Sequence, residues 1–147
     1  MALDSAKSRE IVTNWYMAMG RGDGAGIMGA LDKDVIFILA PKPWTKPIPY
    51  LGTWKGPEGF GKASEIRNST SQITGFELRE VIADGNKVVA LINSKSTCIP
   101  TGVPFELDVV QFLELNDEGK ITKCTAYFDP VPEINAFAPG SVKVEGA

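Results

Sequence analysis

The chain has 147 residues, of which 44% are apolar and 22% charged, with a net charge of −3 and a pI near 5.0. These values are typical of one globular domain, and they argue against disorder and against nucleic acid as a partner. No apolar stretch reaches membrane length and the N-terminus is polar, so we expect a cytoplasmic protein without a membrane span or signal peptide. The chain has no histidine, which argues against Ser–His hydrolases, Cys–His proteases and zinc enzymes.

The N-terminal region is predicted to form two helices. Asp4 or Ser5 can cap a first helix that runs to about Met19, whose apolar residues fall on one face. The glycine-rich run 20–26 ends it, and Asp23 can cap a short second helix. A phosphate-binding loop follows a strand, whereas this run follows a helix. We therefore interpret it as the turn between two helices.

The segment 34–39 has few polar residues and predicts a buried strand. A loop rich in proline and aromatic residues, 41–54, comes next. A third helix is expected from Gly56 to about Arg67, because Pro57 suits a first helical turn.

The rest of the chain is predicted to form four antiparallel strands, at 74–83, 87–99, 103–115 and 120–128. Tight turns at 84–86 and 116–119 join the first pair and the last pair. The order predicts an α+β fold in a single domain, 1–147, with flexible ends at 1–4 and 139–147. Cys98 and Cys124 are expected to be reduced thiols.

Several motifs recur in the order and spacing of a known superfamily: Gly22-Asp23, Asp34-Val35, Gly52-x-x-x-Gly56-x-Glu58, and Gly119-Lys-Ile with Tyr127-Phe-Asp129. Over residues 5–130 the chain resembles the SnoaL-like polyketide cyclases of the nuclear transport factor 2-like superfamily, which also contains ketosteroid isomerase and limonene epoxide hydrolase. The resemblance implies a cone-shaped, curved, antiparallel-rich sheet wrapped around about three N-terminal helices. It also implies an apolar pocket at the wide end.

The resemblance also indicates which residues occupy the family's catalytic positions. Those of ketosteroid isomerase fall on Trp15, with Tyr16 beside it, on Leu39 and on Gln111. Leucine cannot take a proton from carbon, so the isomerase base is missing. The epoxide hydrolase positions fall on Lys95, Thr97, Ala126, Phe37 and Leu39, and the aldol cyclase positions on Ala126 and Gln111. The chain therefore lacks the complete set of catalytic residues of each of these three enzymes.

The polar residues expected to face the pocket form a small group. Side chains alternate between the two faces of a strand, and the aligned family positions indicate which face is inward. On this basis the strand 87–99 turns Val89, Leu91, Asn93, Lys95 and Thr97 inward, and the next strand turns Gln111 inward. Lys95 and Gln111 would then hold a carbonyl, enolate or carboxylate group of an apolar ligand. Alternatively, Lys95 extends to the rim and Gln111 satisfies backbone groups.

Other candidates lie around this group. Tyr16 either hydrogen-bonds inward or caps the core. Asp129 is the remaining acid or base candidate, or it caps the turn before Pro130. Trp44, Tyr50 and Trp54, on the proline-rich loop, would line the mouth of the pocket. Apolar contacts to substrate are expected from Trp15, Phe37, Leu39 and Ala126.

The outer face of the sheet is expected to carry Ile92, Val110, Phe112 and Tyr127, which predicts a homodimer through that face.

We expect a cyclase or isomerase of specialised metabolism that acts on an apolar polyketide- or terpenoid-like substrate without metal or organic cofactor. One alternative is a non-catalytic binding protein for a hydrophobic small molecule. Another is a protein-interaction module that uses the sheet face.

Overall fold

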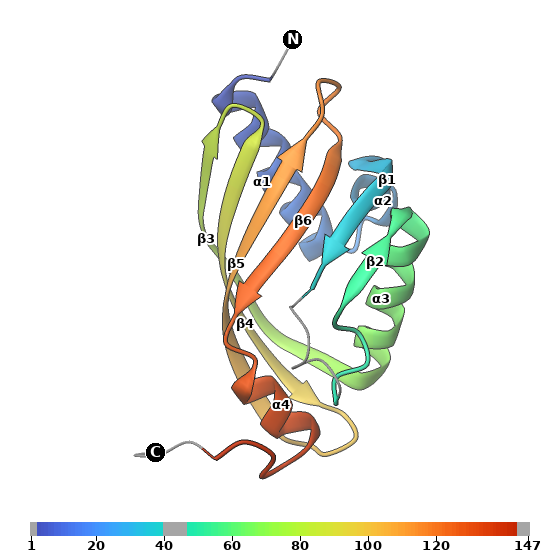
Figure 1. Cartoon of the computed structure of the whole chain (residues 1–147), viewed down its shortest axis with the longest axis vertical. Helices are drawn as coiled ribbons and strands as arrows, with labels where there is room; N and C mark the ends of the chain where they lie inside the picture. The colour runs from blue at the N-terminus through green and yellow to red at the C-terminus, as the bar shows by residue number, and fades with distance from the viewer. Residues whose placement is uncertain (1–2, 40–46, 144–147) are drawn as a thin grey trace.

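The computed structural model describes residues 3–39 and 47–143, and within them it has four helices and six strands (Figure 1). None of these helices is long and apolar enough to cross a membrane. The elements in chain order are α1 (Ser5–Arg21), α2 (Gly24–Gly29), β1 (Leu31–Ile38), β2 (Thr53–Lys55), α3 (Gly56–Thr70), β3 (Ser71–Asp84), β4 (Lys87–Cys98), β5 (Pro104–Leu115), β6 (Ile121–Phe128) and α4 (Val131–Phe137).

Local signals set the ends of the first two helices. The Asp4 carboxylate accepts a hydrogen bond from the Lys7 backbone N–H at 2.7 Å, which caps the start of α1. Gly22 ends α1 with φ 67°, a left-handed conformation that glycine adopts without steric cost. Asp23 then caps α2 by accepting from the Gly26 N–H at 3.0 Å. The predicted turn between two helices is therefore confirmed.

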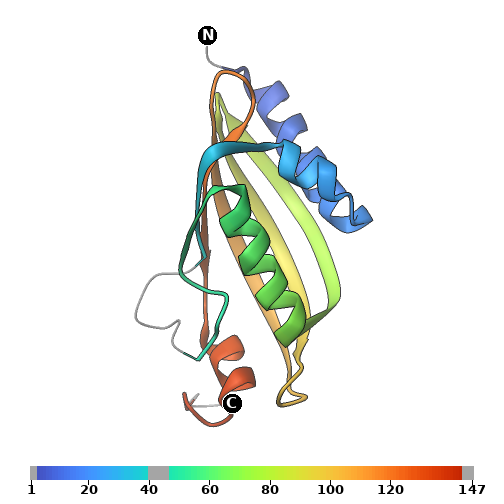
Figure 2. The same cartoon turned by 90° about the vertical axis from the view of Figure 1, so that its right-hand side faces the viewer.

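The strands form one six-stranded sheet in the order β2-β1-β6-β5-β4-β3. All neighbouring pairs are antiparallel except β1 and β6, which are parallel, because helical segments and the long loop separate β1 from the later strands. The sheet curves, and α1 and α3 lie against the same face of it (Figure 2). The predicted α+β class and the curved, antiparallel-rich sheet are confirmed.

The sequence prediction did not include α4. Prolines at 130 and 139 flank this helix and Pro132 lies in its first turn, so the segment resembled a loop in the sequence. Proline is accepted in a first helical turn, however, where its missing N–H has no helical partner. Ala136 packs against Phe105 and Leu107 of β5, and Ile134 packs against Ile48 and Tyr50. This packing holds α4 at the end of the sheet where β6 stops (Figure 1).

Burial largely alternates along β5. Phe105, Leu107 and Leu113 are buried, whereas Glu106 and Asp108 are exposed on the outer face. The buried side contributes to a core with α1, β1 and β6, which includes Val12, Val35, Phe37, Leu113, Leu115, Ile121 and Cys124.

The predicted inward side of β4 is wrong. In an antiparallel pair, directly opposed residues share a face. Leu107 of β5 lies opposite Ser94, and Val109 lies opposite Ile92, so Ser94 and Ile92 face inward. The predicted inward residues Val89, Leu91, Asn93, Lys95 and Thr97 lie on the other side, and Ile92 does not belong to the outer face. Apolar residues on both faces of the first half of β4 concealed the parity.

We expect Leu113→Ala to lower the free energy of unfolding by about 2–5 kcal/mol, because it leaves a cavity beneath the sheet. Leu113 is fully buried, and its inward direction follows from the β5 register. Urea denaturation measures the loss. Ile99→Ala is the matched control, since Ile99 is 53% exposed, and it should cost no more than about 0.5 kcal/mol. Equal losses would contradict the assigned faces.

Candidate functional site

A cavity of about 190 Å³ lies between α1, α3 and the inner face of the sheet, and the segment around Tyr50 and helix α4 border its far end. Its lining is mostly apolar and aromatic, a composition typical of small-molecule sites. Seven residues that the sequence proposed for the site line this cavity: Trp15, Tyr16, Phe37, Leu39, Tyr50, Gln111 and Ala126.

Aromatic rings form one wall of the cavity. The rings of Phe37 and Phe60 stack with their centroids 4.7 Å apart. Trp15 lies 6.1 Å from Phe37 and 6.0 Å from Phe60, measured between ring centroids. Trp15 is held in place because its indole N–H donates to the Ile27 backbone oxygen at 3.2 Å. The three rings therefore come from three different elements and form a fixed apolar surface against which a flat ligand can lie.

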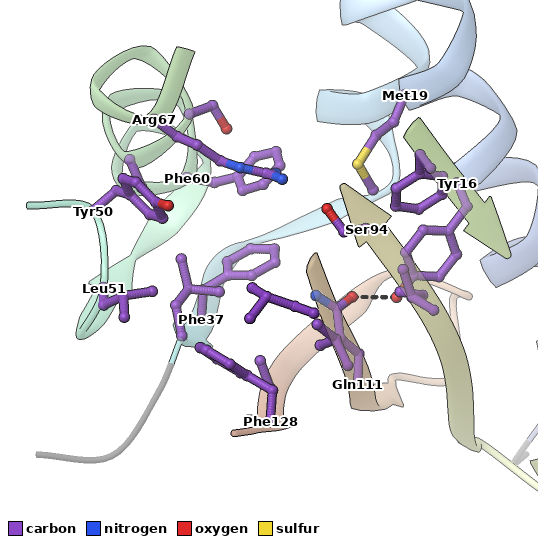
Figure 3. Close-up of a pocket in the computed structure, with 18 of the residues that line it drawn as sticks. Tyr16, Met19, Phe37, Tyr50, Leu51, Phe60, Arg67, Ser94, Gln111 and Phe128 are labelled. Atoms are coloured by element: carbon purple, nitrogen blue, oxygen red, sulfur yellow. Dashed lines mark hydrogen bonds between the residues drawn. The ribbon is translucent and has the colours of Figure 1, made fainter. Parts of the chain in front are cut away.

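Tyr16 and Gln111 form a hydrogen-bonded pair at one end of the cavity. The Tyr16 O–H donates to the Gln111 side-chain oxygen, and the amide nitrogen of Gln111 is directed into the cavity (Figure 3). Burial, and to a smaller extent neighbouring Cys124, raises the pKa of Tyr16 well above its ordinary value. Tyr16 thus stays protonated and fixes the amide, which leaves a Gln111 N–H group available to a ligand oxygen.

A second polar cluster lies at the opposite end, where α4 meets the loop before β2. The Tyr50 O–H donates to Oε2 of Glu133, and the Tyr50 oxygen lies 3.4 Å from the Ser71 hydroxyl. Glu133 is only 2% exposed, and its other oxygen, Oε1, is buried without a hydrogen-bond partner among the described residues. The cavity therefore has a carboxyl group with one unused oxygen.

Burial is the main influence on this carboxyl. It raises the pKa of Glu133, and the Tyr50 hydrogen bond and the Arg67 charge offset only part of that rise. Burial, followed by the Glu133 charge, also raises the pKa of Tyr50 far above its ordinary value, so Tyr50 remains a donor. A carboxyl that keeps its proton closer to neutral pH is suited to proton transfer.

Arg67 reaches the cavity from the last turn of α3. Its guanidinium group extends into the space between the two polar clusters (Figure 3). In the part of the chain that the structure describes, no carboxylate oxygen forms an ion pair with Arg67 within 4.0 Å. Arg67 and Glu133 are the two charged side chains of the described residues that line the cavity.

The structure does not bring the predicted polar group of β4 to the site. Lys95 is exposed on the outer face, opposite Glu106. Asn93 is buried, but its amide donates to Glu106 at 2.8 Å and to Asp108 at 2.9 Å on that same face. Thr97 has the same parity and does not line the cavity. The cause is the β4 register described above.

Two other predicted residues, Asp129 and Trp54, also lie elsewhere. Asp129 is exposed and accepts a hydrogen bond from the Val131 N–H at 3.0 Å, which is the turn-capping alternative. The Trp54 indole donates to the Tyr50 backbone oxygen at 2.9 Å, so Trp54 supports the loop and does not line the cavity. Trp44 lies outside the described residues.

The sequence prediction missed Glu133, Arg67, Phe60 and Ser94. Phe60, Ser64 and Arg67 are spaced four and three residues apart, so they share one face of α3, and this pattern could have identified them. Ser94 required the correct parity of β4. Glu133 gave no comparable signal, because one carboxylate in a proline-flanked segment resembles a surface residue.

The raised pKa of Glu133 predicts a pH-dependent stability difference. The folded protein holds a proton that the unfolded chain releases above about pH 4.3, so the contribution of Glu133 to stability falls as pH rises through the folded-state pKa. Glu133→Gln cannot ionise, so its melting temperature relative to the wild type should increase from pH 4 to pH 8. The exposed Glu118→Gln is the control and should follow the wild type. A constant difference for Glu133→Gln would contradict the prediction.

Comparison with known proteins agrees with this architecture. The SnoaL-like domain matches residues 12–124, and no curated protein matches the chain. An NTF2-like protein from Burkholderia xenovorans superposes with a TM-score of 0.80 at 24% identity, covering 92% of this chain and 98% of that chain. TerC, co-crystallised with polyporic acid, superposes with a TM-score of 0.75 at 24% identity, covering 89% and 98%.

A third structure, a candidate polyketide cyclase from Xanthomonas campestris, has a TM-score of 0.71 at 20% identity, covering 91% of this chain and 98% of its own. At this level of identity, these three likenesses demonstrate the fold alone. The family match, in contrast, extends over most of the strands and helices that enclose the cavity. Its fold is that of the NTF2-like protein above, and the chain belongs to the SnoaL-like domain family.

Proposed function

We propose that this protein is a small-molecule cyclase or isomerase of specialised metabolism, which acts on an apolar polyketide- or terpenoid-like substrate in the cavity. The observation that carries the proposal is the Tyr16–Gln111 pair, which leaves an amide N–H directed into an apolar space. A fixed donor of this kind stabilises negative charge that develops on a carbonyl oxygen. The family match supports the same class of chemistry.

The mechanism that these groups support is enolisation. The substrate carbonyl oxygen accepts a hydrogen bond from Gln111. Glu133, in its ionised form, takes a proton from the carbon beside the carbonyl, and the C–H electron pair forms a C=C bond while the carbonyl π electrons move to oxygen. Where a C=C bond is conjugated with the enolate, return of the proton from Glu133 to the far carbon of that bond gives an isomer. Attack of the enolate carbon on a second carbonyl of the same molecule forms a C–C bond and closes a ring, and the alkoxide formed from that carbonyl takes the proton from Glu133.

The apolar wall contributes by limiting the shapes that a substrate can adopt. Trp15, Phe37 and Phe60 are fixed by their mutual packing, so a flexible chain bound against them loses most of its conformers before reaction. A dry surrounding also strengthens the hydrogen bond from Gln111 to the developing charge.

The alternative function is a non-catalytic binding protein for a hydrophobic small molecule. Leu39 and Ala126, which line the cavity, occupy positions where relatives with known chemistry are expected to carry acids or bases. A cavity whose only carboxyl is already hydrogen-bonded, among the residues described, also suits a carrier. Binding without turnover would favour this alternative.

Deuterium exchange distinguishes the two functions. In D₂O, the wild type should accelerate exchange of the α-protons of 2-tetralone, a flat ring ketone, as followed by proton NMR. Gln111→Leu and Tyr16→Phe should each lower the rate by about 10²-fold, the usual effect of losing one such donor. The rate should fall as pH is lowered through the raised pKa of Glu133, because the base is then protonated.

Lys95→Ala is the matched control, because Lys95 lies on the opposite face of the sheet, and it should retain the wild-type rate. Glu133→Gln should lose both the exchange and its pH dependence. If the wild type binds 2-tetralone but exchanges it no faster than buffer does, the carrier function replaces the enzymatic one.

We also propose that the protein forms a homodimer through the outer face of the sheet. Ile82, Val110 and Tyr127 are 50%, 37% and 58% exposed, and cross-strand pairing puts Leu91 beside Val110 and Tyr127. Apolar surface of this kind is usually covered.

Val110→Glu should convert a dimer to a monomer in size-exclusion chromatography with light scattering. Ile99→Glu, at an exposed turn, is the control, and a monomeric wild type would contradict the proposal.

A further inference from the structure

Arg67 is unusual among the basic residues because its side chain lines an apolar cavity. It is half-buried, and its guanidinium group extends into the space (Figure 3). The charges of Arg67 and Glu133 interact, but the two side chains form no ion pair within 4.0 Å. Guanidinium has five donors and stays charged at any pH of interest. Its charge and donors are therefore available to a ligand.

The surroundings of Arg67 match an oxygen anion on a flat skeleton. The Ser94 hydroxyl, on buried β4, is directed toward the same part of the cavity (Figure 3). Phe60 lies on the same face of α3, seven residues before Arg67, and its ring stacks on that of Phe37 with the centroids 4.7 Å apart. Arginine and a hydroxyl group together donate to two oxygens of one planar group, while the rings contact the skeleton behind it.

We propose that Arg67, with Ser94, binds an anionic oxygen group of the substrate, either a carboxylate or the enolate of an acidic enol, carried on a flat apolar ring system. Such a group would lie between the Tyr16–Gln111 pair and the Tyr50–Glu133 pair, which occupy opposite ends of the cavity. The inference rests on the proposed function, because it requires that the cavity takes a small molecule. It adds the chemical class of that molecule.

We test the proposal with pairs of probes. The two members of each pair have similar shapes, but one is an anion and the other is neutral. The first pair is 2-naphthoate and 2-naphthamide, and the second is 4-hydroxycoumarin, an acidic enol, and coumarin. Quenching of tryptophan fluorescence reports binding, because Trp15 lines the cavity, and calorimetry confirms the dissociation constants. At pH 7 the wild type should bind the anion of at least one pair about 10-fold or more tightly than its neutral partner, as expected for a charge-assisted hydrogen bond. The pair with the larger ratio identifies the carboxylate or the enolate.

Variants of Arg67 and Ser94 test whether these residues cause the tighter binding of the anionic probes. Arg67→Met keeps the apolar stem and should lower anion binding at least 10-fold while changing neutral binding less than about twofold. Arg67→Lys should keep part of the preference, and Ser94→Ala should reduce it. Arg79→Met is the matched control, because Arg79 pairs with Asp108 on the opposite face, and it should bind all four probes as the wild type does.

The outcomes separate this inference from the function on which it rests. Equal binding of both members of each pair would overturn the inference and leave the proposed cavity chemistry intact. Equal weakening of anionic and neutral probes by Arg67→Met would also overturn it, since the side chain would then act by packing. If none of the probes binds and 2-tetralone exchange is absent as well, the inference and the proposed function both fail.

Discussion

The pairing of β4 with β5 determines the chemistry of the cavity. Opposed residues of an antiparallel pair point to the same side, so one register decides which of two sets of side chains faces inward. With Ser94 opposite Leu107, the inner face has small and apolar groups, whereas the polar Asn93 and the charged Lys95 and Glu106 lie on the outer face. A shift of one residue would put a lysine and an asparagine into the cavity. The available space, its dryness and its sparse polar groups all depend on this alignment.

Most helices and strands could be predicted from the sequence because their signals are local and repeated, whereas β2 and α4 were missed, and the curvature of the sheet was expected from the family resemblance. Asp4, Gly22 and Asp23 mark helix ends by chemistry that needs no tertiary contact, and the alternation along β5 is regular. The site was harder to predict. Tyr16 and Gln111 are 95 positions apart, and their meeting depends on the packing of α1 against the sheet. Patterns in one strand or helix do not contain that information.

The two ends of the cavity differ in how their polar groups are held. Tyr16 and Gln111 lie on regular elements, α1 and β5, so their geometry is fixed by the core. Tyr50 lies in the segment before β2, and Glu133 lies on the seven-residue α4. One end is therefore suited to precise orientation of an oxygen atom. The other end carries a buried acid on a short helix near the C-terminal end of the described chain, and Arg67 lies between the two ends.

Because Glu133 lies on α4, the pKa of its carboxyl depends on how this helix packs. The helix that carries the acid has seven residues, and the Asp129 carboxylate accepts a hydrogen bond from the N–H of its first residue, Val131. It is held by the packing of Ile134 and Ala136 and by the Thr101 hydroxyl, which donates to the Ala136 oxygen. Water that enters when α4 moves outward would hydrate the carboxyl and remove the burial that raises its pKa. The acidity of Glu133 therefore depends on how closely α4 packs against the rest of the protein, because that packing is what keeps water from the carboxyl.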